Sequence, residues 1–345
     1  MISSKKWGEY KGKDVFLYTV ENEKGMKVLF TNFGCAVTSI QYKGIDVALG
    51  FDSLEGYVNQ SCYLGVVVGR YANRIKDGQF TLNGSEYTVG KNLGDHHLHG
   101  GFQGFDKVLW EIDAEDKVRN AVRFSYLSRD GEEGYPGNLT VKVTYTLEED
   151  CTLKISYEAV TDQATIVNLT NHTYFNLSGH DAGTVENQKI KIYSEQFLEN
   201  DEVCVPTGEI LSVSGTPFDF REFHKIGERI DDDDIQLKNG GGYDHNYILN
   251  YKEDDELRLA AEAAVEDTAI QMQVYTTMPG IQFYSGNSLN GSKGKDGAVY
   301  GRRCGFCLET QFYPDAVNHH DFPQPVLLPG QLYRHTTSYG FNDIK

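Results

Sequence analysis

Hydrophobic and polar residues alternate with a period of two along most of this chain, the period of a β-strand with one face in the core. The pattern is clearest in nine segments: residues 15–20, 27–33, 36–42, 121–127, 138–147, 152–160, 188–193, 269–277 and 334–341. Within "FTLNGSEYTV", Asn83 and Gly84 stand where a two-residue hairpin turn needs positive φ at both positions. The pattern therefore predicts strands joined by tight turns.

Helical periodicity is scarce. The longest candidate, "ELRLAAEAAV" at residues 256–265, also fits a strand followed by a turn. No Pro/Ser-rich linker, abrupt composition change or fixed repeat divides the 345 residues. We therefore expect an all-β fold in a single large domain spanning residues 1–345. The acidic run at residues 231–234 lacks the spacing of a calcium loop, so we expect a solvated loop there.

The charge balance narrows the possible partners. The chain has 50 acidic and 32 basic residues, for a formal net charge of -18. Such a surface repels phosphate backbones and anionic lipid, which argues against nucleic-acid and membrane partners but not against a neutral small molecule. The chain shows neither an apolar signal segment near residue 1 nor a run of eighteen apolar residues, so we expect a cytoplasmic protein.

Six scattered cysteines fit no disulfide framework, and a cytoplasmic location would keep them as thiols. Cys304 and Cys307 form a lone C-x-x-C in "CGFC". Without a second pair or a nearby βαβ pattern, we interpret this motif as a coincidence rather than a zinc or redox site.

The stretch "VNLTNHTYFNL", residues 167–177, carries the first sign of chemistry. As a strand, it would have one largely apolar face and one face of hydrogen-bonding side chains: Asn168, Thr170, His172, Tyr174 and Asn176. A polar face on a strand whose back is buried suggests the wall of a wet groove that could grip a neutral polyol. A structural histidine satisfied by neighbouring amides is the alternative for His172, and this stretch alone leaves it open.

A second candidate lies near the C-terminus. The same alternation in residues 306–313 places Cys307, Glu309, Gln311 and Tyr313 on one side of a strand. Glutamate is depleted from strands, so Glu309 needs a partner or a purpose. A salt bridge to an arginine and a catalytic role explain this pattern equally well.

Two glycine-associated segments add further polar groups. "GRYANRI", residues 69–75, offers Arg70, Asn73 and Arg74 as rigid donors, although surface ion pairs would explain them as well. "GGGYDHNY", residues 240–247, places Asp244 after three glycines that would let a loop approach a ligand closely. The alternative for Asp244 is an ordinary turn aspartate.

The segment "GDHHLHGG", residues 94–101, contains an H-x-H pair, His97 and His99. On a strand this spacing points both imidazoles to one side, as in some metal sites. No third ligand is located by the sequence, so metal binding is the minority interpretation.

Taken in order, "GRYANRI", "LHGG", "NLTNHTYFNL", "YDHNY", "PGIQFYSGN" and "LETQFYPDAVNH" give a chain that resembles the aldose 1-epimerase, or galactose mutarotase, family over most of its length. The resemblance implies a galactose mutarotase-like β-supersandwich that interconverts the α and β anomers of free aldohexoses such as galactose and glucose, without metal or cofactor. It implies Glu309 as general base, His172 as general acid and His99 near the ring oxygen. The sugar hydroxyls would be held by Asn73, Arg74, Asp244 and Gln282.

Two positions depart from the family pattern. His96 stands where the family usually has asparagine, and Met278 stands where glutamine is expected. Either change could alter sugar preference without touching the chemistry. The expected partner is a small aldose, and the chain could act as a monomer or a homodimer.

Three other functions stay open at this stage. An epimerase of hexose 6-phosphates would need several cations near the phosphate, and only Arg70 and Arg74 stand together near a motif. A glycosidase could be built on Asp244 and Glu309 if the two carboxyl groups were suitably spaced. A carbohydrate-binding sandwich would hold sugars without converting them and would need no paired acid and base.

Overall fold

The computed structural model describes residues 1–250, 252 and 256–344. All nine predicted segments form strands, and the ambiguous "ELRLAAEAAV" segment is also a strand, β22 (Arg258–Val265). In β13 (Leu139–Leu147) every second side chain is buried, as the period of two requires. The predicted hairpin turn joins β8 (Gln79–Leu82) to β9 (Ser85–Thr88), with positive φ at both Asn83 and Gly84.

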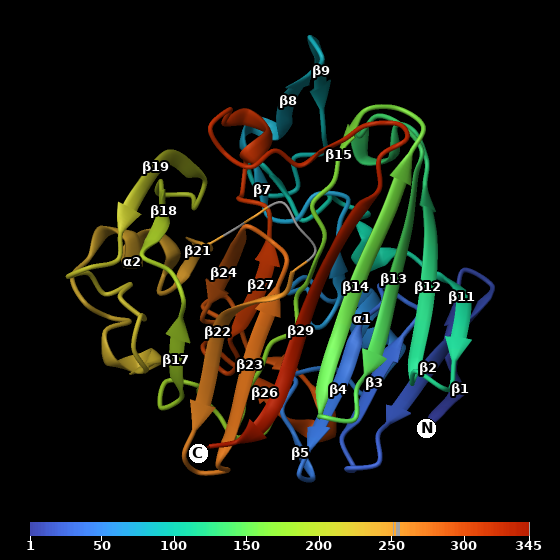
Figure 1. The fold of residues 1–345 in the computed structure, drawn as a ribbon, viewed down its shortest axis with the longest axis vertical. Coiled ribbons are helices and arrows are strands. Elements are labelled where there is room, and N and C mark those ends of the chain that lie inside the picture. The colour runs from blue at the N-terminus through green and yellow to red at the C-terminus, as the bar shows by residue number, and fades with distance from the viewer. Residues whose placement is uncertain (251, 253–255, 345) are drawn as a thin grey trace.

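Three large sheets, all antiparallel, organise the described residues (Figure 1). The first has the order β1 (Ile2–Tyr10), β2 (Lys13–Glu21), β3 (Lys27–Thr31), β4 (Val37–Tyr42) and β5 (Ile45–Asp46). The second has the order β11 (Glu111–Asp116), β12 (Ala121–Ser128), β13, β14 (Thr152–Thr161), β29 (Tyr333–Asp343), β23 (Ile270–Thr276), β22, β17 (Lys189–Ile192) and β20 (His224–Lys225). The third has the order β19 (Pro206–Ser212), β18 (Gln196–Asn200), β21 (Asp244–Ile248), β24 (Gly280–Tyr284) and β27 (Cys307–Gln311).

Shorter elements connect and cap these sheets. The remaining strands pair two by two: β10 (His97–Leu98) with β7 (Arg74–Ile75), β15 (Thr165–Ile166) with β28 (Val326–Leu327), β16 (Thr170–Asn171) with β6 (Val67–Val68), β25 (Ser292–Lys293) with β26 (Val299–Tyr300), and β8 with β9. The helices are α1 (Leu54–Asn59), α2 (Ile235–Gly240) and the single 3₁₀ turns η1 (Lys76–Gly78), η2 (Phe105–Lys107), η3 (Glu132–Gly134), η4 (Ile226–Glu228), η5 (Lys295–Gly297) and η6 (Ala316–Asn318).

The large sheets share one hydrophobic core. A single cluster of buried side chains includes Phe30 of β3, Val143 of β13, Met272 of β23 and Leu308 of β27. In Figure 1 the first sheet lies behind β12, β13 and β14, which is the layering of a β-sandwich. Because Leu308 points into this core, its neighbours Cys307 and Glu309 on β27 face the other way.

The prediction of a strand with one wet face at residues 167–177 is only partly right, because His172 and Tyr174 line a cavity but the stretch is not a half-exposed strand. Only Thr170 and Asn171 form a ladder, and all eleven residues of the stretch are buried. Other segments pack against it on more than one side, since Phe175 pairs with both Ala48 and Phe306. Asn168 and Asn176, which were expected to line the groove, instead donate to main-chain carbonyls.

The acidic run at residues 231–234 is largely exposed, as predicted, but two of its members have structural roles. Asp231 accepts from the buried guanidinium of Arg303 at 2.6 Å and 3.0 Å. Asp234 is the N-cap of α2 and accepts from the backbone N–H groups of Gln236 and Leu237.

The six cysteines, Cys304 and Cys307 included, are all free thiols. In the described part of the chain, no helix is both long enough and apolar enough to cross a membrane.

Candidate active site

A cavity of about 410 Å³ opens beside the third sheet and collects most of the predicted site. Its lining includes Asn73, Arg74, His99, His172, Asp244 and Glu309, which come from segments far apart in the chain. Asn73 and His99 both have positive φ, 65° and 52°; Asn73 comes directly before β7 and His99 directly after β10, so the chain turns at both positions. The sequence motifs therefore converge on one place.

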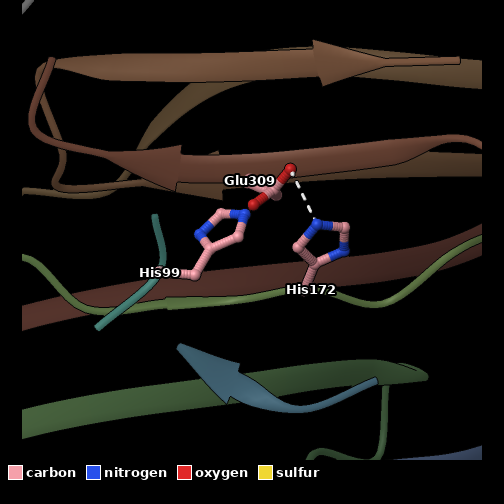
Figure 2. A group of neighbouring side chains, drawn as sticks. All are labelled: His99, His172 and Glu309. Atoms are coloured by element: carbon pink, nitrogen blue, oxygen red, sulfur yellow. Dashed lines mark ion pairs between the residues drawn. The ribbon is translucent and has the colours of Figure 1, made fainter. Parts of the chain in front are cut away.

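Glu309 and His172 face each other across this cavity. Glu309 is 2% exposed and His172 is 4% exposed. Glu309 Oε1 lies 3.6 Å from His172 Nε2, whereas Glu309 Oε2 is buried and has no hydrogen-bond partner among the described residues. Figure 2 shows the imidazoles of His172 and His99 next to each other, with the Glu309 carboxyl group facing both. A buried carboxylate oxygen without a donor is costly, so it marks a place for a ligand hydroxyl.

Burial controls the protonation of this pair. It raises the pKa of the Glu309 carboxyl well above its ordinary value, and the nearby Asp244 raises it further against the effect of Arg74. Burial lowers the pKa of His172 to about 4, partly offset by its own main-chain carbonyl and by Asp244. Both shifts act in the same sense, because burial favours a neutral carboxyl group and a neutral imidazole, so a single proton shared by the pair would lie on Glu309 in this arrangement.

The donor set does not fit a metal site, although one ligand atom from each of His99, His172 and Glu309 lies within 4.8 Å of the others. The backbone N–H of Asn73 donates to His99 Nδ1 at 3.0 Å. A neutral imidazole that accepts at Nδ1 carries its proton on Nε2, so His99 presents a donor to the cavity rather than a lone pair. Metal-binding histidines normally donate with their second nitrogen, the opposite arrangement.

The possible H-x-H metal pair is not formed. His97 is fully buried; its Nδ1 lies 2.6 Å from the carbonyl oxygen of Gly90 and its Nε2 lies 2.5 Å from the hydroxyl of Tyr135. His97 therefore has a structural role outside the cavity. The positive φ of His99 ends the strand after Leu98, so the alternation that would align the two rings does not extend to His99.

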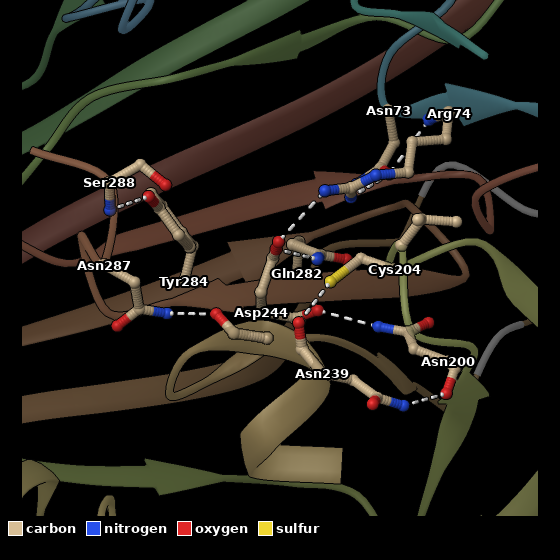
Figure 3. Close-up of polar contacts among 12 residues, drawn as sticks. Asn73, Arg74, Asn200, Cys204, Asn239, Asp244, Gln282, Tyr284, Asn287 and Ser288 are labelled. Carbon is tan, nitrogen blue, oxygen red and sulfur yellow. Dashed lines mark hydrogen bonds and ion pairs between the residues drawn. The ribbon is translucent and has the colours of Figure 1, made fainter. Parts of the chain in front are cut away.

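Asp244 is the centre of a second polar group, shown in Figure 3. Arg74 donates to Asp244 Oδ2 at 3.2 Å, and Gln282 Nε2 donates to Asp244 Oδ1 at 2.6 Å. Asn73 Oδ1 accepts from the Arg74 guanidinium at 3.3 Å. Gln282 is buried and is not part of the cavity lining, so it reaches the cavity only through Asp244.

Three tyrosines, Tyr63, Tyr174 and Tyr284, surround His172, with ring centroids 5.9, 5.0 and 6.4 Å from its imidazole. The sequence placed Tyr174 on the predicted polar face of residues 167–177. It gave Tyr284 no role, although this residue lies in the motif "PGIQFYSGN", and no pattern marked Tyr63. A segment with a superficial likeness to a phosphate loop, residues 286–293, supplies Ser288, Asn290 and Ser292 to the lining.

Three other sequence candidates lie outside the cavity lining. Arg70 is 2% exposed and donates to Ser128 and to the carbonyls of Pro136 and Gly137. His96 accepts from the backbone N–H of Asp77 at 3.0 Å. Met278 lies in the core. Neither His96 nor Met278, the two residues that depart from the family pattern, therefore lines the cavity.

The chain matches known proteins over nearly all of its length. The family model described as aldose 1-epimerase matches residues 17–340. The galactose mutarotase of Bos taurus is 46% identical over 323 residues, which cover 92% of this chain and 91% of the relative. The aldose 1-epimerase of Escherichia coli is 39% identical over 339 residues, 96% of each chain.

Solved structures agree with these sequence matches. The galactose 1-epimerase of Lactobacillus acidophilus superposes with a TM-score of 0.88 at 31% identity and covers 99% of both chains. An aldose epimerase homologue from C. elegans has a TM-score of 0.85 at 28% identity, with 95% of this chain and 98% of that chain covered. The extent of these matches and the shared fold show that the chain belongs to the aldose 1-epimerase family.

Proposed function

We propose that this enzyme interconverts the α and β anomers of free aldohexoses such as galactose and glucose, with Glu309 as general base and His172 as general acid. Aldose anomer interconversion is the activity of the family, which makes the protein an isomerase. The observation that best supports this proposal is the buried pair of Glu309 and His172. Glu309 Oε1 lies 3.6 Å from His172 Nε2, whereas Oε2 has no hydrogen-bond partner among the described residues.

Mutarotation needs two proton carriers that act together. Glu309 removes the proton of the anomeric hydroxyl while His172 gives a proton to the ring oxygen, and the bond between the ring oxygen and the anomeric carbon breaks. The resulting aldehyde turns about its bond to the next carbon. Ring closure returns the proton from the ring oxygen to His172 and the proton from Glu309 to the new hydroxyl. No atom or electron is gained or lost, so the cycle needs no co-reactant.

The mutarotation cycle needs one proton on the pair formed by Glu309 and His172. Burial places that proton on Glu309, whereas the reacting arrangement has an ionised carboxylate and an imidazolium. A sugar hydroxyl that donates to Glu309 stabilises the carboxylate, and a ring oxygen that accepts from His172 stabilises the imidazolium. Substrate contact therefore favours transfer of the proton from Glu309 to His172 before the ring opens.

The remaining polar groups suit sugar hydroxyls. His99 would donate from Nε2 near the ring oxygen, since its Nδ1 is taken by Asn73. Asp244 has the free acceptor capacity of a carboxylate, and Arg74 Nε has no acceptor among the described residues. Gln282 would contribute by orienting Asp244.

A phosphorylated sugar fits this cavity less well. Arg74 is the sole cation among the described residues that line the cavity, and it is already paired with Asp244. Arg70, the other cation considered for a phosphate, donates to the protein interior.

We further propose a cytoplasmic location and a monomer or homodimer. The net charge of -18 argues against nucleic-acid partners.

Polarimetry tests the proposal. Freshly dissolved α-D-galactose, α-D-glucose and α-D-glucose 6-phosphate are followed at neutral pH in EDTA, with the Glu309→Gln variant as the blank. We expect faster decay to the same final rotation for galactose and glucose. An unchanged decay for both, with folded protein, contradicts the proposal. Binding without acceleration would indicate a carbohydrate-binding module, and a preference for the phosphate ester would indicate a hexose-6-phosphate epimerase.

A further inference from the structure

The second ring nitrogen of His172 contacts a thiol. Cys307 Sγ lies 3.5 Å from His172 Nδ1, and both side chains are buried. Cys307 and Glu309 are two residues apart on β27 and face the same side, about 6.6 Å apart along the strand. The imidazole of His172 therefore lies between the thiol at Nδ1 and the carboxyl group at Nε2.

Cys307 is suited to a ring that changes protonation. The thiol is fully buried, and burial raises its pKa well above the ordinary value, so it keeps its proton at neutral pH. A thiol is both a weak donor and a weak acceptor. It can donate to a bare Nδ1 and accept from a protonated Nδ1, so it can contact the ring in every state that the proton transfer at Nε2 requires.

The weakness of this contact has a chemical consequence. In serine proteases a carboxylate accepts from Nδ1, holds the ring and stabilises the imidazolium. A carboxylate at this place would make the imidazolium of His172 a weaker acid. The Cys307 sulfur orients the ring but stabilises the positive charge of the imidazolium only weakly. The imidazolium of His172 therefore remains acidic enough to protonate the ring oxygen of the sugar.

We propose that Cys307 is a positioning residue for the reaction: it holds the His172 ring with Nε2 toward Glu309 and the sugar, and it keeps the imidazolium a strong acid. This inference rests on the proposed function of His172 as the proton donor. Other titratable groups also surround the ring, and a test must separate Cys307 from them: Glu309, His99, Tyr63, Tyr174, Tyr284 and the more distant Asp244.

Three replacements separate polarity from packing. Cys307→Val fills the space without a hydrogen bond, Cys307→Ser keeps a donor and an acceptor, and Cys307→Ala removes both the contact and the volume. We expect Cys307→Val to lower kcat about 3- to 10-fold with KM unchanged, which corresponds to the loss of one hydrogen bond. Cys307→Ser should recover most of this loss. Because a hydroxyl is the stronger acceptor, its acidic limb in the kcat profile should move to higher pH.

A measurement independent of turnover completes the test. The ¹⁵N chemical shifts of the His172 ring report its tautomer, and thermal unfolding reports whether each variant is folded. We expect the ring shifts to change in Cys307→Val and to stay near the wild-type values in Cys307→Ser. Wild-type kcat, pH profile and ring shifts in Cys307→Val would overturn the inference. The inference would also be overturned if Cys307→Val, but not Cys307→Ser, restored the activity that Cys307→Ala loses. An inactive wild type would instead contradict the proposed function, whatever the ring shifts show.

Discussion

Two buried glutamates show how differently the protein treats the same group. Glu262 of β22 is 7% exposed and Glu309 of β27 is 2% exposed. Glu262 accepts from the Tyr193 hydroxyl at 2.5 Å and from the amides of Gln271 and Gln273 at 2.6 and 3.1 Å. Glu309 Oε2, by contrast, has no donor among the described residues. Burial alone therefore does not identify a reacting carboxyl group. A buried carboxyl group that lacks hydrogen-bond donors is the better candidate.

The strongest test of this difference is to replace each glutamate by glutamine in turn. Glu309→Gln should lower kcat by about 10² to 10⁴, because an amide cannot accept the anomeric proton. Its free energy of unfolding should change little, since no donor in the described chain loses its acceptor at Oε2. Polarimetry measures the rate and urea unfolding measures the stability.

Glu262→Gln is the matched control. The new amide would bring an N–H group toward the donors around it, so we expect a loss of about 1 to 3 kcal/mol in the free energy of unfolding. Its kcat should stay within about twofold of wild type, because Glu262 does not line the cavity. If both variants lost activity equally, the contrast between the two carboxyl groups would have no catalytic meaning.

The pH profile tests the same difference between the two carboxyl groups. Below the pKa of His172, about 4, both members of the pair are protonated and the base is lost. Above the raised pKa of Glu309 both are deprotonated and the acid is lost. We expect kcat/KM to be bell-shaped and to fall about tenfold per pH unit beyond each limb. Glu262→Gln should leave both limbs in place, and a profile without an alkaline limb would argue against an acid and base pair.

The two arginines of "GRYANRI" repeat the contrast with smaller effects. Arg70 donates to several buried oxygens, whereas Arg74 lines the cavity beside Asp244. Arg70→Lys should lower the free energy of unfolding by about 2 to 4 kcal/mol, because an ammonium cannot reproduce the fork of contacts. Arg74→Lys should mainly raise KM, about tenfold. Urea unfolding and polarimetry separate the two, and a reversed pattern would exchange the roles of these residues.

Much of this arrangement could be predicted from the sequence. A period of two identifies strands because it reports burial on one face, and β13 and β14 follow it residue by residue. At residues 167–177 the pattern placed His172 and Tyr174 correctly on the face that lines the cavity, but it failed for Asn168 and Asn176, because neighbours on more than one side bury polar and apolar groups alike. It failed again at His99, where a positive φ breaks the alternation after Leu98. Tyr63 and Ser288 reach the cavity only through tertiary packing, which no local pattern encodes.

The smallest expected effect concerns the departure from the family pattern at position 96. His96 accepts from the backbone N–H of Asp77, and it is not part of the cavity lining. His96→Asn should therefore leave KM and kcat for galactose and glucose within about twofold of wild type, and its loss of stability should not exceed the worth of one exposed hydrogen bond, about 1 kcal/mol. Polarimetry with both sugars measures this. A change in the ratio of kcat/KM between the two sugars would show that the β7–β10 strand pair transmits sugar preference from His96 to His99. His96 would then count among the residues that determine specificity, although it does not line the cavity.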